Sequence, residues 1–177
     1  MAHNEFYSLM DAVSSELQVG SLWHSAAATA FAQIGLRGKS RWSRSESIGD
    51  LKSRLELEKL LVDKCNYIPT ITIDMPQVSW QSISDLPTIL RNWEASEREF
   101  IKTLMQAFKQ AAEIDVEVYR KLLDITNEVQ GEAFRVSRCI QRYEATDYYH
   151  HDVMRSDLEI HNYFRDNPEC QKADFSI

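Results

Sequence analysis

The sequence predicts an all-α protein, a four-helix bundle with a long crossover between the second and third helices and a short fifth helix. The 177 residues include only five glycines and four prolines, and no proline interrupts the chain from about residue 88 to residue 167. Such a stretch favours long helices. Apolar residues recur at helical spacing both before and after one extended segment of the sequence. This combination indicates two pairs of helices joined by a long connection.

Five helices are expected, over residues 5–34, 40–66, 84–112, 115–145 and 147–164. The first ends at a turn that begins with Gly35, and the third starts with Ser84 as its N-cap and Pro87 in its first turn. The segment 67–82 contains β-branched residues and prolines and is expected to be extended. Its length suits a crossover between parallel helices, because a long helix spans roughly 40 Å. We expect a single domain over residues 1–177, with the bundle in 1–145 and a short helix and tail in 146–177.

The composition is that of an ordinary globular chain with an acidic balance. There are 27 acidic and 20 basic residues, for a formal charge of -7. This charge disfavours nucleic acid and anionic membranes as partners and suits cations. The N-terminus lacks the pattern of a signal peptide, and no apolar stretch approaches the roughly 20 residues that span a bilayer. Cys65, Cys139 and Cys170 match neither a disulfide framework nor a zinc pattern, so reduced thiols and a cytoplasmic location are expected.

Three acidic residues lie within apolar helix faces, where leucines would be expected. Glu16 lies in the first helical segment, and Glu94 and Glu97 lie in the third. At 100° per residue these side chains point toward the core. A buried carboxylate without a partner is costly and normally needs a cation, a proton or several hydrogen bonds. Acids of this kind on different helices of one bundle favour a metal site.

Four segments, taken in order over residues 5 to 145, resemble the ferritins, and most closely the prokaryotic non-haem type. SSELQVGSLWHSAAATAF resembles the first helix, whose iron ligand would be Glu16, and IGLRGKSRWSRS resembles the turn into the second helix. WEASERE resembles the third helix around its ligand, here Glu94. NEVQGEA resembles the fourth-helix motif Glu-Gln-x-Glu-Glu and supplies Glu128 and Glu132, with Val129 in the place of Gln.

The second helix departs from the pattern of that family, which carries Glu-x-x-His. Alignment from the preceding turn places Asp50 and Ser53 at these positions, whereas alignment from Glu58 places Ser53 and Glu56 there. We prefer the first register, because it needs no gap and keeps a carboxylate at Asp50. Neither register supplies a histidine.

The resemblance implies a ferritin-like bundle that binds non-haem iron (Fe2+/Fe3+), oxidises Fe(II) with dioxygen or peroxide and stores ferric mineral in a homo-oligomeric, 24-subunit shell. It implies that Glu16 and Glu94 are terminal ligands of two different irons and that Asp50 bridges them. Glu128 and Glu132 would serve the second iron and a neighbouring site. Glu97, one turn from Glu94, is added as a further candidate, and no catalytic residue apart from the metal ligands is expected.

Other interpretations of these residues remain open. Asp50 fits a solvated face, Glu128 fits a solvated ladder, and Glu97 could pair with a nearby base. His24 lies beside the apolar stripe of the first helix, where a core or interface role is expected rather than ligation. The function could also be that of a non-catalytic ferritin homologue, acting as a structural or nucleating shell, or that of another diiron-carboxylate oxidase. His150, His151 and His161 are expected to pack the last helix against a neighbour.

Overall fold

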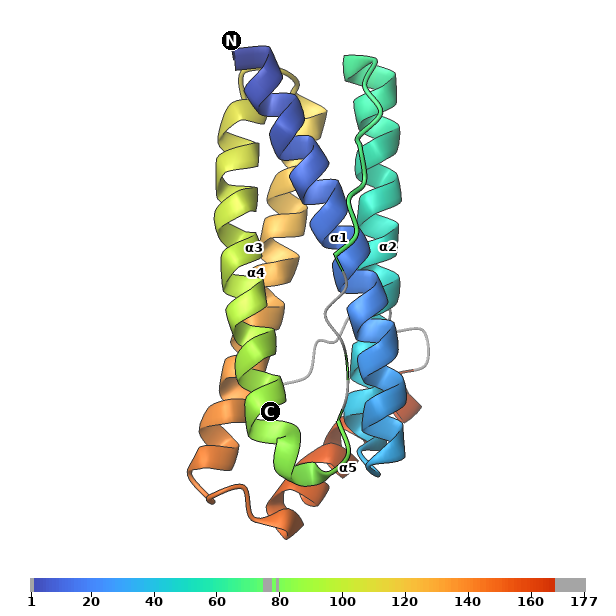
Figure 1. Cartoon of the computed structure of the whole chain (residues 1–177), viewed down its shortest axis with the longest axis vertical. Coiled ribbons are helices and arrows are strands. Elements are labelled where there is room, and N and C mark those ends of the chain that lie inside the picture. Colours follow the sequence, from blue (N-terminus) through green and yellow to red (C-terminus); the bar gives the residue numbers. More distant parts are fainter. Residues whose placement is uncertain (1, 75–77, 79, 168–177) are drawn as a thin grey trace.

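The computed structural model describes residues 2–74, 78 and 80–167 (Figure 1). Its helices are α1 (Ala2–Gln33), α2 (Arg37–Cys65), α3 (Leu86–Ala111), α4 (Val116–Glu144) and α5 (His150–Asp166), with the short 3-10 helix η1 (Ile83–Asp85) before α3. Over these residues there is no strand. The predicted all-α bundle with a long crossover and a short fifth helix is therefore confirmed.

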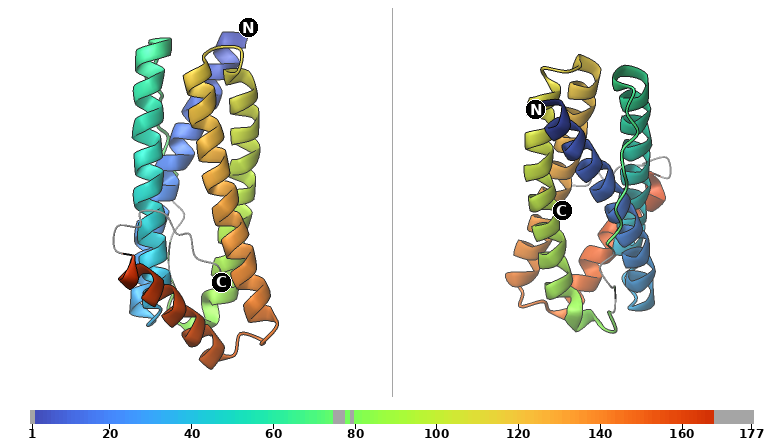
Figure 2. Two further views of the ribbon diagram at one scale, coloured as in Figure 1. Left: turned by 180° about the vertical axis from the view of Figure 1, so that it is seen from behind. Right: turned by 45° about the horizontal axis from the view of Figure 1, so that its top comes forward.

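The four long helices form two pairs, α1 with α2 and α3 with α4 (Figures 1 and 2). The described part of the chain between α2 and α3 runs along the bundle beside α1 and α2, and α2 and α3 point the same way. Its first part is fastened to α1 by Asp11 Oδ1, which accepts hydrogen bonds from the Tyr67 hydroxyl at 2.5 Å and the Thr70 amide at 2.7 Å. The short α5 crosses one end of the bundle and packs against α2. No helix in the described part of the chain is long and apolar enough to cross a membrane.

α5 is held at the start of α2 by a network of buried polar groups. α2 has no side-chain cap of its own, and the Asp157 carboxylate of α5 instead accepts hydrogen bonds from the amides of Gly38 at 2.9 Å and Lys39 at 2.8 Å. A β-carbon at Gly38 would lie 2.0 Å from the Asp157 carbonyl oxygen, so only glycine permits this approach. The fully buried Lys39 ammonium donates to the Tyr143 hydroxyl at 2.6 Å, and that hydroxyl donates to Ser156 at 2.9 Å.

The apolar core consists of two separate clusters, one toward each end of the bundle. The cluster near α5 includes Phe31, Trp42, Trp93, Val136 and Tyr143. The other includes Met10, Leu17, Leu57, Leu104 and Leu122. Between the two clusters, each long helix carries polar residues on its inward side: Ser21 and His24 on α1, Glu46 and Asp50 on α2, Glu97 on α3 and Glu132 on α4. A polar layer thus divides the core.

Cys65 and Cys139 are free thiols, the first half-buried and the second buried. This fits the expectation of reduced cysteines for these two residues. Cys170 lies outside the described residues.

Candidate metal centre

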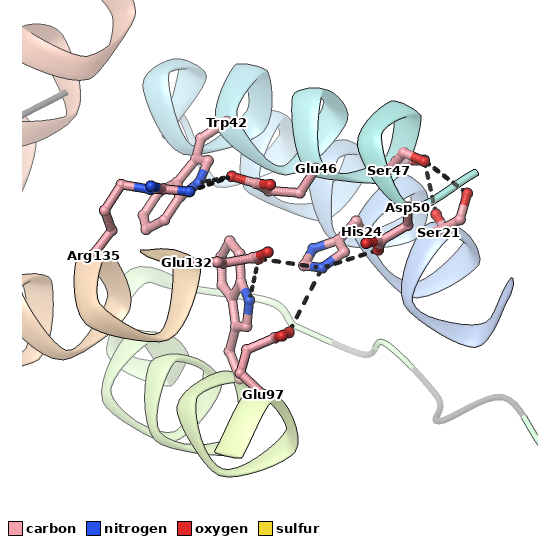
Figure 3. Close-up of polar contacts among 10 residues, drawn as sticks. Ser21, His24, Trp42, Glu46, Ser47, Asp50, Glu97, Glu132 and Arg135 are labelled. Carbon is pink, nitrogen blue, oxygen red and sulfur yellow. Dashed lines mark hydrogen bonds and ion pairs between the residues drawn. The ribbon is translucent and has the colours of Figure 1, made fainter. Parts of the chain in front are cut away.

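His24 lies at the centre of the polar layer, with its side chain 2% exposed. Its Nε2 atom is 3.4 Å from Oε1 of Glu132, 3.8 Å from Oδ2 of Asp50 and 4.0 Å from Oε1 of Glu97 (Figure 3). The other ring nitrogen, Nδ1, is buried and has no hydrogen-bond partner. Four helices therefore bring one imidazole and three carboxylates to a single point.

Two buried tryptophans and one arginine orient the carboxylates of this layer. The indole nitrogen of Trp42 donates to Glu46 Oε1 at 2.7 Å, and Arg135 Nη2 donates to the same oxygen at 3.3 Å. The indole nitrogen of Trp93 donates to Glu132 Oε1 at 2.8 Å. A carboxylate has about four lone-pair positions, so each acid held in this way can still bind a metal ion.

Small residues let α1 and α2 approach closely beside the cluster. The Ser21 hydroxyl donates to the Ser47 carbonyl at 2.9 Å, and the Ser47 hydroxyl donates to the Ser21 carbonyl at 2.8 Å (Figure 3). A β-carbon at Gly20 would lie 2.7 Å from Asp50 Oδ2. Glycine at this position leaves room for the Asp50 carboxylate between the two helices.

Burial and mutual repulsion raise the pKa values of the acids in the layer. The pKa of Glu97 is raised to about 8, first by burial and then by Glu46 and other acids. The same causes raise the pKa values of Asp50 and Glu132 well above their usual range. Burial lowers the pKa of His24 to about 3, so its imidazole is neutral and can offer a lone pair. The raised pKa values favour the neutral, protonated acids, so a metal ion that binds these carboxyl groups would displace protons.

The positions of these groups fit a divalent cation. Ligand atoms of His24, Glu97 and Glu132 all lie within 4.8 Å of one another. Two ligands bonded to one ion at about 2.1 Å lie roughly 3.0–4.2 Å apart, depending on the angle between them. The three distances to His24 Nε2 fall in this range. A set of one imidazole with several carboxylates suits first-row divalent ions such as Fe(II).

The candidate residues taken from the sequence divide into two groups in the structure. Asp50, Glu97 and Glu132 lie at the cluster. Glu128 lies at its border. The charge of Glu128 contributes to the raised pKa of Asp50, and its carboxylate accepts a hydrogen bond from Ser53 at 3.3 Å.

Glu16 and Glu94 are not in the group of close ligand atoms that includes His24. Glu16 is exposed, but it lines the same cavity as His24 and Glu97, and its charge contributes to the raised pKa of Glu97. Glu94 accepts a hydrogen bond from Arg98 at 2.7 Å, which lowers the pKa of Glu94. The structure therefore does not bring Glu94 into the group of close ligand atoms, and on α3 that position belongs to Glu97.

Two residues of the centre were not among the sequence candidates. His24 was expected to be a core or interface histidine, and it is buried, but three carboxylates surround it. Glu46 lies with Asp50 and Ser53 in a polar row of the second helix and was not a candidate. The spacing of Glu46 and Asp50 by four residues, one helical turn, is the signal that could have identified both as inward-facing.

Comparison with known proteins rests on structure alone. No protein-family model matches the sequence, and no curated protein matches it. The open pore ferritin of the hyperthermophilic archaeon Archaeoglobus fulgidus superposes with a TM-score of 0.76 at 15% identity, covering 88% of this chain and 95% of that one. A humanized archaeal ferritin gives a TM-score of 0.77 at 16% identity, covering 88% and 93%. A Rhodobacter capsulatus bacterioferritin gives 0.70 at 14% identity, covering 80% and 87%.

These similarities establish that the chain has the ferritin-like fold. The resemblance read from the sequence is confirmed at this level. At such low identities the similarity defines the architecture only, and the function has to be argued from the residues of the site.

Proposed function

We propose that this chain binds Fe(II) in its polar layer, oxidises it and, as a homo-oligomeric shell, stores the ferric product. One observation carries the proposal: His24, Glu97 and Glu132 converge from three helices in the buried interior. Among the residues that the structure describes, Asp50, Glu97 and Glu132 have no Lys or Arg nitrogen within ion-pair distance. The acids outnumber the bases of the layer, as a site for cations requires.

The neutral nitrogen ligand is assigned to His24. In the pattern that the sequence resembles, a histidine of the second helix has this role, and here that position is Ser53. The imidazole of His24 reaches the same carboxylates from α1, so the site keeps one nitrogen donor on a different helix. A buried, neutral imidazole binds a metal without first losing a proton.

The number of acids favours two Fe(II) ions. Dioxygen or peroxide accepts electrons in pairs, so an oxidation site gains from two Fe(II) ions held close together. Around His24 the layer offers five carboxylates, those of Glu46, Asp50, Glu97, Glu128 and Glu132. Carboxylates can bridge two ions, and the indole donors hold Glu46 and Glu132 in place for them.

Storage is supported by the fold and by the charge of the chain. The solved structures with the same fold include ferritins and a bacterioferritin with a metal-free dinuclear site. The formal charge of -7 suits a surface that attracts Fe(II). Light scattering tests this part directly, because a mass near that of a monomer or dimer would exclude a shell.

An anaerobic Fe(II) titration by calorimetry, followed by stopped-flow mixing with oxygen, tests the proposal. The full chain is compared with a Glu97→Gln, Glu132→Gln double variant and with Glu99→Gln, a control on the exposed side of α3. We expect tight binding of a few irons per subunit by the full chain and the control, with fast oxidation. Binding no stronger than in the double variant would exclude the iron site, and mineral growth without a fast phase would indicate a non-catalytic nucleating shell.

A further inference from the structure

A cavity of about 240 Å³ adjoins the polar layer between α1 and α3. Asp50 of α2 and Trp80 of the crossover also line it, so the cavity has walls from three helices and from the connecting segment. Asn92 and Ser96 of α3 are exposed lining residues and mark its opening to solvent. The space is larger than a metal ion requires.

Aromatic rings form much of the wall. Trp23 contacts Trp80 and Trp93 at ring-centroid distances of 5.8 Å and 5.3 Å, both with the rings edge to face. Phe100 also lines the cavity. The negative face of an aromatic ring attracts cations, including the primary ammonium group of a lysine, and several rings around one space bind quaternary ammonium groups.

The charged groups that line the cavity are all acidic. Glu16 lies at the exposed side, and Asp50 and Glu97 lie at the inner side. No lysine or arginine is among the lining residues that the structure describes. An organic anion would therefore meet only like charges, whereas an ammonium group would meet carboxylates and ring faces.

We propose that this cavity binds a small organic cation, a primary ammonium group attached to a single aromatic ring. The ring lies among the tryptophans and the ammonium group is directed to Glu97 and Asp50. The volume agrees with this size, because an engineered cavity of about 150 Å³ holds benzene, and 240 Å³ leaves space for a short aminoalkyl chain.

The ammonium site shares His24, Asp50 and Glu97 with the proposed metal cluster, so an amine and Fe(II) would compete for these residues. Glu46 and Glu132, which belong to the metal cluster, do not line the cavity, and Trp23 and Trp80, which do, are not candidate ligands. Binding of the amine is therefore measured on the metal-free full chain. Calorimetry with Fe(II) on the same preparation keeps the two proposals distinguishable, because either can fail while the other holds.

The test titrates the metal-free chain with benzylammonium chloride, benzyl alcohol and sodium benzoate, three one-ring compounds that differ in charge. We expect saturable binding of benzylammonium, at least about tenfold weaker binding of the alcohol and no binding of benzoate, because a hydrogen bond to a charged group contributes about 1.5–3 kcal/mol. Equal affinities for the three compounds, or no saturable signal from benzylammonium, would overturn the proposal.

Two variants on α3 locate the site. Glu97→Gln removes the inner carboxyl group that would pair with the ammonium group and is expected to weaken benzylammonium binding about tenfold or more. Glu99→Gln is the matched control, since Glu99 is an exposed partner of Lys102 outside the cavity, and it should leave the affinity unchanged. Quenching of tryptophan fluorescence in the unmodified chain gives a second readout that needs no variant. Equal affinities of the two variants would place the amine elsewhere.

Discussion

Two buried polar regions of this bundle differ in whether their charged side chains have partners of opposite charge. At the α5 end, Lys39 is fully buried but lies against Asp157, Tyr143 and Ser156 in one connected network. In the middle of the bundle, the acids around His24 have one arginine at their edge, bound to Glu46. The first region contains a carboxylate that balances its buried lysine. In the second region, among the described residues, the acids outnumber the bases.

The pKa values of the buried groups in the two regions are shifted in ways that agree with this difference in charge balance. Burial by itself lowers the pKa of Lys39, but Tyr143 and Asp157 outweigh it, and the pKa is raised. In the polar layer burial and neighbouring charges act together, and the pKa values of Asp50 and Glu132 are raised strongly. A buried charge becomes costly to the fold when its partner is removed, whereas a surplus of one sign indicates a place for a ligand.

The largest effect on stability is expected from breaking the network at α5. Lys39→Met should lower the free energy of unfolding by about 3–5 kcal/mol, because it leaves Asp157 buried without its cation. Urea denaturation measures the change. The control Lys102→Met removes an exposed pair with Glu99 and should cost less than about 1 kcal/mol. Similar losses for both variants would contradict the structural role of the network.

Removing an acid of the polar layer is expected to weaken metal binding without lowering the free energy of unfolding. Glu132→Gln is expected to weaken divalent metal binding by about 10- to 100-fold. The metal-free chain should lose no stability, since Gln still accepts the Trp93 hydrogen bond and no buried carboxylate remains to be neutralised. Calorimetric metal titration and urea denaturation of the same variant give both values. A clear loss of stability without metal would mean that Glu132 serves the fold.

The pH dependence of the metal-free chain should reveal the surplus of acids. Folding raises the pKa of Glu97 from 4.5 to about 8. Between these values the folded state binds more protons than the unfolded state, so stability falls as pH rises. Each such proton contributes a slope of about 1.4 kcal/mol per pH unit. Denaturation from pH 5 to 8, roughly this window, should show a flatter profile for Glu97→Gln, and identical profiles would exclude the titration of Glu97.

Much of the architecture follows from local chemistry that a sequence displays. Glycine and proline positions, apolar stripes and the polar extended segment define five helices and the crossover, and the observed ends of the long helices differ from the expected ones by at most three residues. The cap of α2 could not be predicted in this way. Its hydrogen-bond acceptor is Asp157, which is 118 residues from Lys39 in the chain.

The composition of the site was harder to predict, because it depends on how the helices rotate against one another. The sequence indicated that acids from several helices meet inside, but Glu94 and Glu97 point in directions about 60° apart around α3, so a modest rotation of this helix decides between them. His24 becomes a candidate ligand only when α2, α3 and α4 each direct a carboxylate at it. Such a coincidence between four helices leaves no signal in any one of them.

The smallest effect on stability and Fe(II) affinity is expected from Glu94→Gln. Its comparison with Glu97→Gln tests which face of α3 points to the metal cluster. Glu94 is paired with Arg98, whose side chain is 62% exposed, so Glu94→Gln should change the free energy of unfolding by less than about 1 kcal/mol. It should leave Fe(II) affinity within about twofold, whereas Glu97→Gln, three residues further along the same helix, should lower it about tenfold or more. Parallel titrations of the two variants measure this difference. A greater loss from Glu94→Gln would mean that α3 turns on metal binding and that the ligand indicated by the sequence pattern is the one used.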